Sequence, residues 1–330
     1  MQASATYVNP VWDGYFADPF VWRHGDEYFA IGTGPAEAAG AVGPRVFPLL
    51  RSPDLATWRA AGHALVRPDA ALGDAYWAPE VAYAAGTFFL YYSVGHQDAG
   101  HQLRVATSPR PEGPYVDAGH ALVDPGTCAF AIDPHPFRDD DGRWYLFYAR
   151  DFLDAGPSCR AGTALVVEPL DGMTRLAGTP TVVLRARHDW QRFARDRAMY
   201  GGRYDWHTLE GPAVLRHDGR HYCFYSGGRW ETADYGVDYA VAAHVLGPYD
   251  DRGAEHGPRV LRSAPPDAVG PGHNSFVVGP DGDTVYVAYH AWDGQLRARR
   301  MFVDRLVWTS AGPRCLGPTT DPQPRPGFAR

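Results

Sequence analysis

Short runs of alternating apolar and polar residues recur along the chain, each followed by a glycine turn and then by an aromatic segment. The clearest copy, residues 132–150, reads IDPHPFRDDDGRWYLFYAR. An Asp-Gly pair between strand-forming residues is the strongest short-range signal of a β-hairpin. The aromatic residues after the turn suit the half-buried surface of a sheet. The pattern therefore predicts a β-hairpin in this segment.

Four further segments repeat this plan, and neighbouring turn glycines are 56 to 77 residues apart. The five turns lie at Gly25, Gly86, Gly142, Gly219 and Gly282. Five copies of one hairpin are typical of propeller blades. We predict an all-β fold, a five-bladed β-propeller with four-stranded blades and almost no helix. The copies cover most of residues 1–330, which predicts a single domain whose N-terminal strand, within 7–12, closes the last blade.

Each hairpin opens on a polar residue, and the opening positions of propeller blades converge on the axis. These residues are Asp18, Glu80, Asp133, Glu210 and His273. A single acid at a strand start usually makes a local turn, but Asp18, Asp133 and Glu210 at equivalent repeat positions predict a cluster. Clustered carboxylates raise the pKa of at least one member. A protonated acid beside an ionised base is what cleavage of a glycosidic bond needs.

Five short motifs, one per hairpin and in order, resemble those of glycoside hydrolase family 43, five-bladed propeller enzymes that act on arabinose and xylose polysaccharides. The motifs are ADPF at 17–20, WAPEV at 77–81, IDP at 132–134, LEGP at 209–212 and GHNS at 272–275. The resemblance covers nearly the whole chain. It implies that Asp18 is the general base, Glu210 the general acid, and Asp133 the residue that orients the acid and tunes its pKa.

The same resemblance implies an arginine from the last blade that contacts the substrate and the pKa-tuning Asp133. Arg299 is the candidate, with Arg300 as the alternative because one step along a strand changes the face. His273 opens the fifth hairpin, and the resemblance places it on the axis, where it contacts substrate and helps to hold a hydrated structural calcium ion. No loop with an acidic cage supports that metal independently.

Aromatic side chains beside the motifs are candidates for stacking on a sugar ring. Trp77 and Phe20 suit this role because aromatic faces pack against sugars. Glu80, next to Trp77 in its motif, is predicted to bind substrate too. Three loops, 34–46, 95–101 and 185–207, are predicted to shape the pocket, the last being the longest insertion between repeats.

Charge and composition exclude other classes of function. The formal net charge of −7 gives no basic surface for nucleic acid. The four cysteines are far apart and form no CxxC pair, which argues against a metal centre or a disulfide framework. The first residues contain no basic region followed by an apolar run, so no membrane partner is expected. A cytoplasmic enzyme is predicted, or a secreted one if a signal peptide has been removed.

We therefore predict an inverting glycoside hydrolase that releases pentose units from arabinose- or xylose-containing oligosaccharides or polysaccharides. An α-L-arabinofuranosidase is favoured, because no C-terminal β-sandwich of the kind that some xylosidases carry is evident. A β-D-xylosidase or an endo-arabinanase of the same family is the alternative. A non-catalytic carbohydrate-binding propeller and a retaining fructan-processing relative are the other readings.

Overall fold

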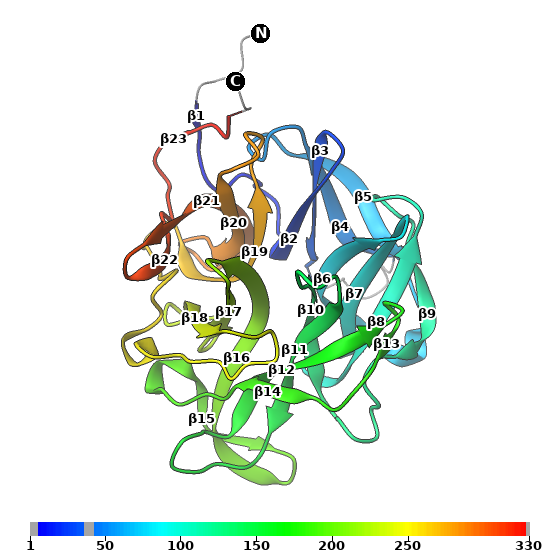
Figure 1. The fold of residues 1–330 in the computed structure, drawn as a ribbon, viewed down its shortest axis with the longest axis vertical. Helices are drawn as coiled ribbons and strands as arrows, with labels where there is room; N and C mark the ends of the chain where they lie inside the picture. Colours follow the sequence, from blue (N-terminus) through cyan, green and yellow to red (C-terminus); the bar gives the residue numbers. More distant parts are fainter. Residues whose placement is uncertain (1–5, 36–42, 328–330) are drawn as a thin grey trace.

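The computed structural model describes residues 6–35 and 43–327 and consists of five antiparallel blades around a common centre (Figure 1). The strands of blade 1 are β2 (Ala17–His24), β3 (Glu27–Thr33), β4 (Arg45–Ser52) and β5 (Arg59–Val66). Those of blade 2 are β6 (Ala75–Ala84), β7 (Thr87–His96), β8 (Ala99–Ser108) and β9 (Val116–Ala121). Those of blade 3 are β10 (Ala131–Arg138), β11 (Trp144–Phe152), β12 (Gly162–Asp171), the two-residue β13 (Arg175–Leu176) and β14 (Thr181–Leu184).

Blades 4 and 5 come from the second half of the chain. The strands of blade 4 are β16 (Gly202–His217), β17 (Arg220–Gly227) and β18 (Gly236–Ala242). Those of blade 5 are β19 (Val269–Val278), β20 (Val285–Trp292), β21 (Arg299–Thr309) and β22 (Gly312–Cys315). Outside the blades lie β1 (Thr6–Tyr7), β15 (Arg192–Met199) and β23 (Gln323–Pro324), and the short 3₁₀ turns η1 (Ala70–Leu72), η2 (Asp189–Gln191) and η3 (Ala254–His256).

Burial of apolar side chains between neighbouring blades closes the ring. The described residues form five hydrophobic clusters, and each is shared by two adjacent blades. One of them joins the last blade to the first, where Tyr286 packs in the same cluster as Tyr28. The first strands of the blades, β2, β6, β10, β16 and β19, contact one another in the same cyclic order (Figure 1). The prediction of an all-β, five-bladed propeller is therefore confirmed.

The N-terminal segment runs along the outer edge of blade 5. The amide of Val11 donates to the carbonyl of Met301, and the amide of Phe16 donates to that of Arg299. β22 pairs with the second half of β21, from Leu306 to Thr309. The edge of β21 is thus covered by two segments, one from each end of the chain. Near those ends, β1 and β23 pair with each other (Figure 1).

The prediction of four strands in every blade is wrong for blade 4. Among the described residues, its outer edge is covered only by isolated bridges, Val241 with Asp250 and Val237 with Leu261. The segment 243–268 after β18 carries Pro248, Pro258 and a Pro-Pro pair. Proline lacks the N–H that a continuous strand ladder requires. Blade 4 instead gains pairing at its inner strand, because the first half of β16 continues outward and pairs with β15.

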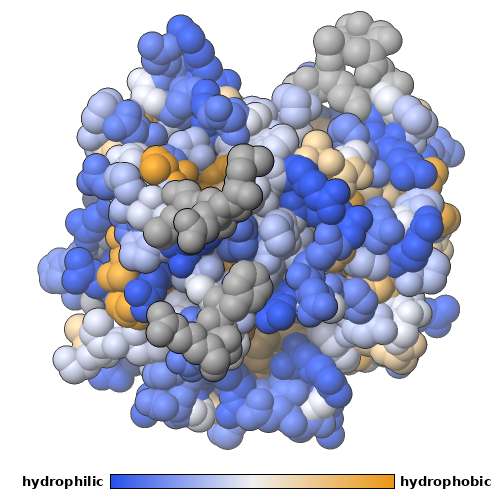
Figure 2. All heavy atoms as spheres, turned by 90° about the horizontal axis from the view of Figure 1, so that it is seen from above, coloured by the Kyte–Doolittle hydropathy of each residue, from blue (hydrophilic) through white to orange (hydrophobic). Residues whose placement is uncertain are grey.

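The face of the molecule seen in Figure 2 is mostly hydrophilic, with hydrophobic residues in small patches. No helix of the described residues is long and apolar enough to cross a membrane. The cellular location stays a prediction.

Candidate active site

A bulge recurs at the same place in the first strand of every blade. In each case the register with the next strand shifts over three residues, as between Ala17 and Phe20 in β2. One residue inside each bulge has a positive φ: Asp18 (50°), Ala78 (46°), Asp133 (58°), Gly211 (55°) and His273 (51°). Bulges re-aim side chains, and a positive φ costs a non-glycine residue ~1–3 kcal/mol. The repeated strain turns the first strands toward the axis.

The bulges correct the prediction that three acids occupy equivalent positions. Asp18 and Asp133 are equivalent to each other and to His273, but Glu210 lies one residue before the matching position, which Gly211 fills. The amide of Gly211 donates to Oδ2 of Asp133 at 2.9 Å. A Cβ at Gly211 would lie 3.1 Å from the ring of His273. Three blades meet at this point. Glycine leaves room for the ring of His273 and adopts the positive φ without strain.

The three acids line one large cavity of about 1160 Å³ at the axis. His273 and Arg299 line it too, together with Trp77. Parts of all three predicted pocket loops contribute, namely residues 34, 35 and 46, residues 97 and 98, and residues 193–206. Residues 36–42 of the first loop lie outside the described part of the chain.

Asp18 is a buried carboxylate held in its ionised form. Its Oδ1 lies 3.2 Å from Nη1 of Arg299 and 3.5 Å from Nδ1 of His273, and its own amide donates to Nδ1 of His290. Burial alone would raise the pKa of Asp18, but the positive charge of Arg299 leads the opposing contributions and holds that pKa well below its usual range. Asp18 is therefore available as a base at neutral pH.

Glu210 has the opposite character. Burial raises its pKa to about 7, the charge of Asp18 adds to the rise, and a hydrogen bond from Tyr235 opposes it. The hydroxyl of Tyr235 donates to Oε1 at 2.7 Å. Asp133 has a pKa raised well above its usual range, by burial first and then by the charges of Glu210 and Asp18. The two acids share protons as a pair, so the titration near neutral pH belongs to both.

One ionised carboxylate and one protonated carboxylic acid thus face a single cavity. This combination supports general base catalysis on a water molecule and general acid catalysis on a leaving oxygen.

Comparison with known proteins identifies the family of the chain. Residues 7–313 match the model of glycosyl hydrolases family 43. The chain belongs to glycosyl hydrolase family 43. It is a glycoside hydrolase, as the sequence motifs predict.

Among its relatives, this family 43 protein is 31% identical over 323 residues to "Beta-D-galactofuranosidase xynD" of Aspergillus niger, covering 92% of this chain and 83% of the relative. It is 24% identical to "Extracellular exo-alpha-(1->5)-L-arabinofuranosidase" of Streptomyces avermitilis, over 87% of this chain but only 56% of that protein. A crystal structure of a thermostable family-43 glycoside hydrolase superposes with a TM-score of 0.83 at 30% identity, covering 98% of this chain and 99% of the other.

The structure distinguishes the two arginines of this family 43 protein. Arg299 lies in the cavity, donates two hydrogen bonds to the hydroxyl of Tyr15 at 3.0 and 2.8 Å, and packs 4.5 Å above the ring of Trp230. Arg300 points to the other face and pairs with Asp13 and Asp293. The ion pair of Arg299 is with Asp18, the expected base, and not with Asp133 as the resemblance implied.

Two predicted substrate contacts lie outside the cavity lining. Phe20 follows the bulge of β2 and stacks on Trp22 at 6.0 Å, within the hydrophobic cluster between blades 1 and 2. Glu80 lies two residues beyond the bulge of β6 and is buried, with Oε2 2.7 Å from Nδ1 of His135. Glu80 was predicted to open its hairpin and Phe20 to stack on a sugar, but each lies just after the bulge of its strand and its side chain packs in the protein.

Trp77 lines the cavity, and its ring stacks on His101 at 3.7 Å. One face is therefore covered by His101, so a sugar would meet the other face or the edge.

His273 is buried between the two aspartates, 3.5 Å from Asp18 and 3.9 Å from Asp133. Burial lowers the pKa of His273, which favours the neutral ring. Within residues 6–35 and 43–327, no group of three or more His, Cys, Asp or Glu side chains is arranged to hold a metal ion. Calcium prefers six to eight oxygen ligands, so these side chains do not form a calcium cage by themselves. The calcium ion stays a prediction, which calorimetric titration of chelator-treated protein would test.

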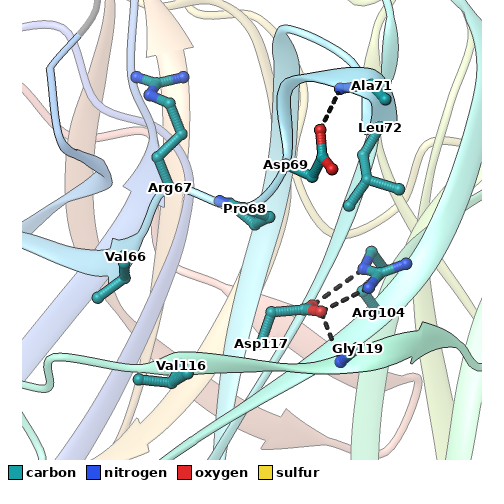
Figure 3. Close-up of a pocket in the computed structure, with 10 residues that line it drawn as sticks. All are labelled: Val66, Arg67, Pro68, Asp69, Ala71, Leu72, Arg104, Val116, Asp117 and Gly119. Atoms are coloured by element: carbon teal, nitrogen blue, oxygen red, sulfur yellow. Dashed lines mark hydrogen bonds and ion pairs between the residues drawn. The ribbon is translucent and has the colours of Figure 1, made fainter.

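A second pocket, of about 440 Å³, lies on the outside between blades 1 and 2 (Figure 3). Its wall carries Asp117, which accepts hydrogen bonds from Arg104 and from the amide of Gly119. Asp69 accepts from the amide of Ala71. These acids are occupied by local contacts, and the pocket contains no acid–base pair comparable with that of the axial cavity.

Sequence reasoning missed Tyr235 and His290. Tyr235 lies in the loop before β18, where no repeat pattern marks it. His290 lies in the apolar run of β20, opposite Gly272. A histidine in such a run could have indicated a functional residue, because buried polar groups are uncommon. Burial lowers the pKa of His290 to about 4, and its ring is parallel to that of Tyr235.

Proposed function

We propose that this family 43 protein is an inverting α-L-arabinofuranosidase that removes single arabinose units from oligosaccharides or polysaccharides. The observation that carries the proposal is the opposite protonation of two buried carboxyls in one cavity, with the pKa of Asp18 lowered and that of Glu210 raised to about 7. Arabinofuranosidases among the relatives support the choice of sugar.

In this mechanism Glu210 protonates the glycosidic oxygen while Asp18 takes a proton from a water molecule that attacks the anomeric carbon from the opposite face. The C–O bond to the leaving group breaks as the new C–O bond forms, so configuration inverts in one step. Asp133 accepts from the amide of Gly211 and titrates together with Glu210, so the charge of Glu210 disfavours ionisation of Asp133 and the pair retains a proton near neutral pH. Arg299 keeps Asp18 ionised and, with its remaining donors, binds the sugar.

A β-D-galactofuranosidase is the second candidate, because the relative at 31% identity carries that name. The rings of α-L-arabinofuranose and β-D-galactofuranose have the same configuration and differ only in the exocyclic chain. A cavity of about 1160 Å³ exceeds the usual pocket range of roughly 300–1,000 Å³ and leaves room for the longer chain.

A panel of nitrophenyl glycosides tests the choice. We expect the highest kcat/KM on the α-L-arabinofuranoside, with the β-D-galactofuranoside and β-D-xyloside as competing outcomes. Absence of hydrolysis of every glycoside in the panel and of arabinan and xylan oligomers would favour a binding propeller instead. Proton NMR of the first-formed sugar then decides stereochemistry: the substrate's own anomeric configuration, seen before mutarotation, would refute the single displacement.

A further inference from the structure

One wall of the cavity is built by the strand pair that leads into Glu210. We call β15 and the first half of β16 the hairpin wall; they pair from Arg192 opposite His207 to Met199 opposite Gly202. Phe193, Arg197 and Met199 of β15 line the cavity, as do Trp206 and Thr208 of β16. Glu210 follows on the same β16. The hairpin wall is therefore on the side of the cavity where Glu210 stands.

Asp151 lies in the cavity lining next to this wall, and the mechanism above does not use it. It stands near the end of β11, the strand next to β10 with Asp133, and is opposite Thr163 of β12. Its Oδ2 accepts from the hydroxyl of Tyr200 at 2.7 Å, and its Oδ1 accepts from that of Thr163 at 2.9 Å. A carboxylate has about four acceptor sites, so two hydroxyl donors leave capacity for a ligand.

Tyr200 comes from the turn of the hairpin wall, so its bond to Asp151 joins the hairpin to blade 3. On the other side, Nη2 of Arg197 lies 3.0 Å from Oδ2 of Asp98, which belongs to the turn between β7 and β8. The guanidinium of Arg197 also covers the ring of Phe193 at 4.8 Å. An exposed ion pair such as this one contributes only ~0–1 kcal/mol, so its effect is to position the hairpin beside blades 2 and 3.

The chemistry of the site decides which part of the substrate meets this wall. A general acid must stand next to the oxygen that leaves, so the leaving group lies on the side of Glu210. Asp18, Arg299 and Tyr15 come from blade 1, blade 5 and the N-terminal segment, on the side of the attacking water. A sugar beyond the scissile bond therefore extends toward blade 3 and the hairpin wall.

We propose that the hairpin wall and Asp151 form the leaving-group subsite and that Asp151 accepts hydrogen bonds from hydroxyl groups of the sugar that leaves. The ligand is a neutral sugar with adjacent hydroxyls, which suits a carboxylate that already accepts from two hydroxyls. Tyr200 orients Asp151 through the hydrogen bond from its hydroxyl. This inference rests on the proposed glycosidase function.

The test compares two substrates with the same glycone: a nitrophenyl glycoside, whose leaving group carries no sugar hydroxyl, and an unmodified oligosaccharide. For Asp151→Ala we expect kcat/KM on the oligosaccharide to fall about 10- to 100-fold, the range for a lost hydrogen bond to a charged group. On the nitrophenyl glycoside it should change less than about threefold. Tyr200→Phe, which keeps the ring, should give the same selectivity with a smaller loss on the oligosaccharide.

Asp154→Ala is the matched control, because Asp154 is an exposed acid three residues along the chain that pairs with Arg185 and does not line the cavity. Asp154→Ala should leave kcat/KM unchanged on both substrates. Equal losses on both substrates for Asp151→Ala and Tyr200→Phe, or no loss on either, would overturn the proposal. If the wild type does not cleave arabinofuranosides, only the choice of glycone is refuted. The ratio of kcat/KM on the oligosaccharide to kcat/KM on the aryl glycoside can still be measured with the sugar that the enzyme does cleave.

Discussion

Replacing Tyr235 by Phe removes a hydroxyl that donates to the proposed general acid. The ring itself is tightly seated, since a Cβ at Gly272 would lie 2.1 Å from Cε1 of Tyr235. The substitution keeps that ring and its position parallel to His290. The hydrogen bond from Tyr235 stabilises the ionised form of Glu210 and lowers its pKa. Its loss should therefore raise the pKa of Glu210.

The size of the shift follows from the strength of the bond. A buried hydrogen bond to a charged acceptor contributes ~1.5–3 kcal/mol, and one pKa unit corresponds to ~1.4 kcal/mol. The pKa of Glu210, about 7 in the native protein, should rise by about one to two units. Glu210 acts in its protonated form, so the basic limb of the pH–rate profile should move upward by the same amount. The limb is a property of the Glu210–Asp133 pair.

The assay is kcat/KM against pH between about 4 and 10, on a glycoside whose leaving group needs protonation. The plateau rate should fall by far less than the full contribution of a general acid, about 10²–10⁴-fold. Tyr289→Phe is the control, because Tyr289 donates to another buried carboxylate, Asp304, at 2.7 Å and does not line the cavity. A basic limb that stays in place or moves to lower pH in Tyr235→Phe would refute the reasoning.

Three further predictions test other parts of the site. Glu210→Gln and Asp18→Asn should each remove nearly all activity without unfolding the protein. Only Glu210→Gln should regain activity on substrates with good leaving groups, since these need little protonation. If Asp18→Asn is rescued instead, Asp18 is the acid and Glu210 the base. Arg299→Gln should lower kcat/KM at least about tenfold and move the acidic limb of the pH–rate profile to higher pH, because the charge that lowers the pKa of Asp18 is lost. Arg300→Gln, on the outer face, should leave kcat/KM within about twofold and the acidic limb in place. Gly211→Ala should destabilise the fold by ~1–3 kcal/mol in urea denaturation, because alanine is strained at its φ of 55°; an unchanged midpoint would show that the bulge relaxes.

The sequence by itself determined the local elements. Asp-Gly and glycine turns, together with the aromatic segments after them, act over a few residues, so the hairpins could be read without tertiary contacts. Their repetition then predicted the propeller and the convergence of polar positions on one axis. The ordered motifs also placed Asp18, Asp133 and Glu210 in one site, although the offset of Glu210 by one residue did not follow from them.

Tertiary structure decided how each side chain is aimed. In a strand the faces alternate with a period of two, but a bulge breaks that alternation and re-aims the side chains around it. This is why Glu80 and Phe20 turned into the protein. Arg299 and Arg300 lie on opposite faces of β21, and the regular register of that strand with β20 placed Arg299 in the cavity. His290 of blade 5 meets Asp18 of blade 1 only because the blades close into a ring. Tyr235 meets Glu210 because the loop before β18 brings it back to the first strand of the same blade. The pKa values that separate the two carboxyls arise from that burial and from the charge of Arg299, which exist only in the folded protein.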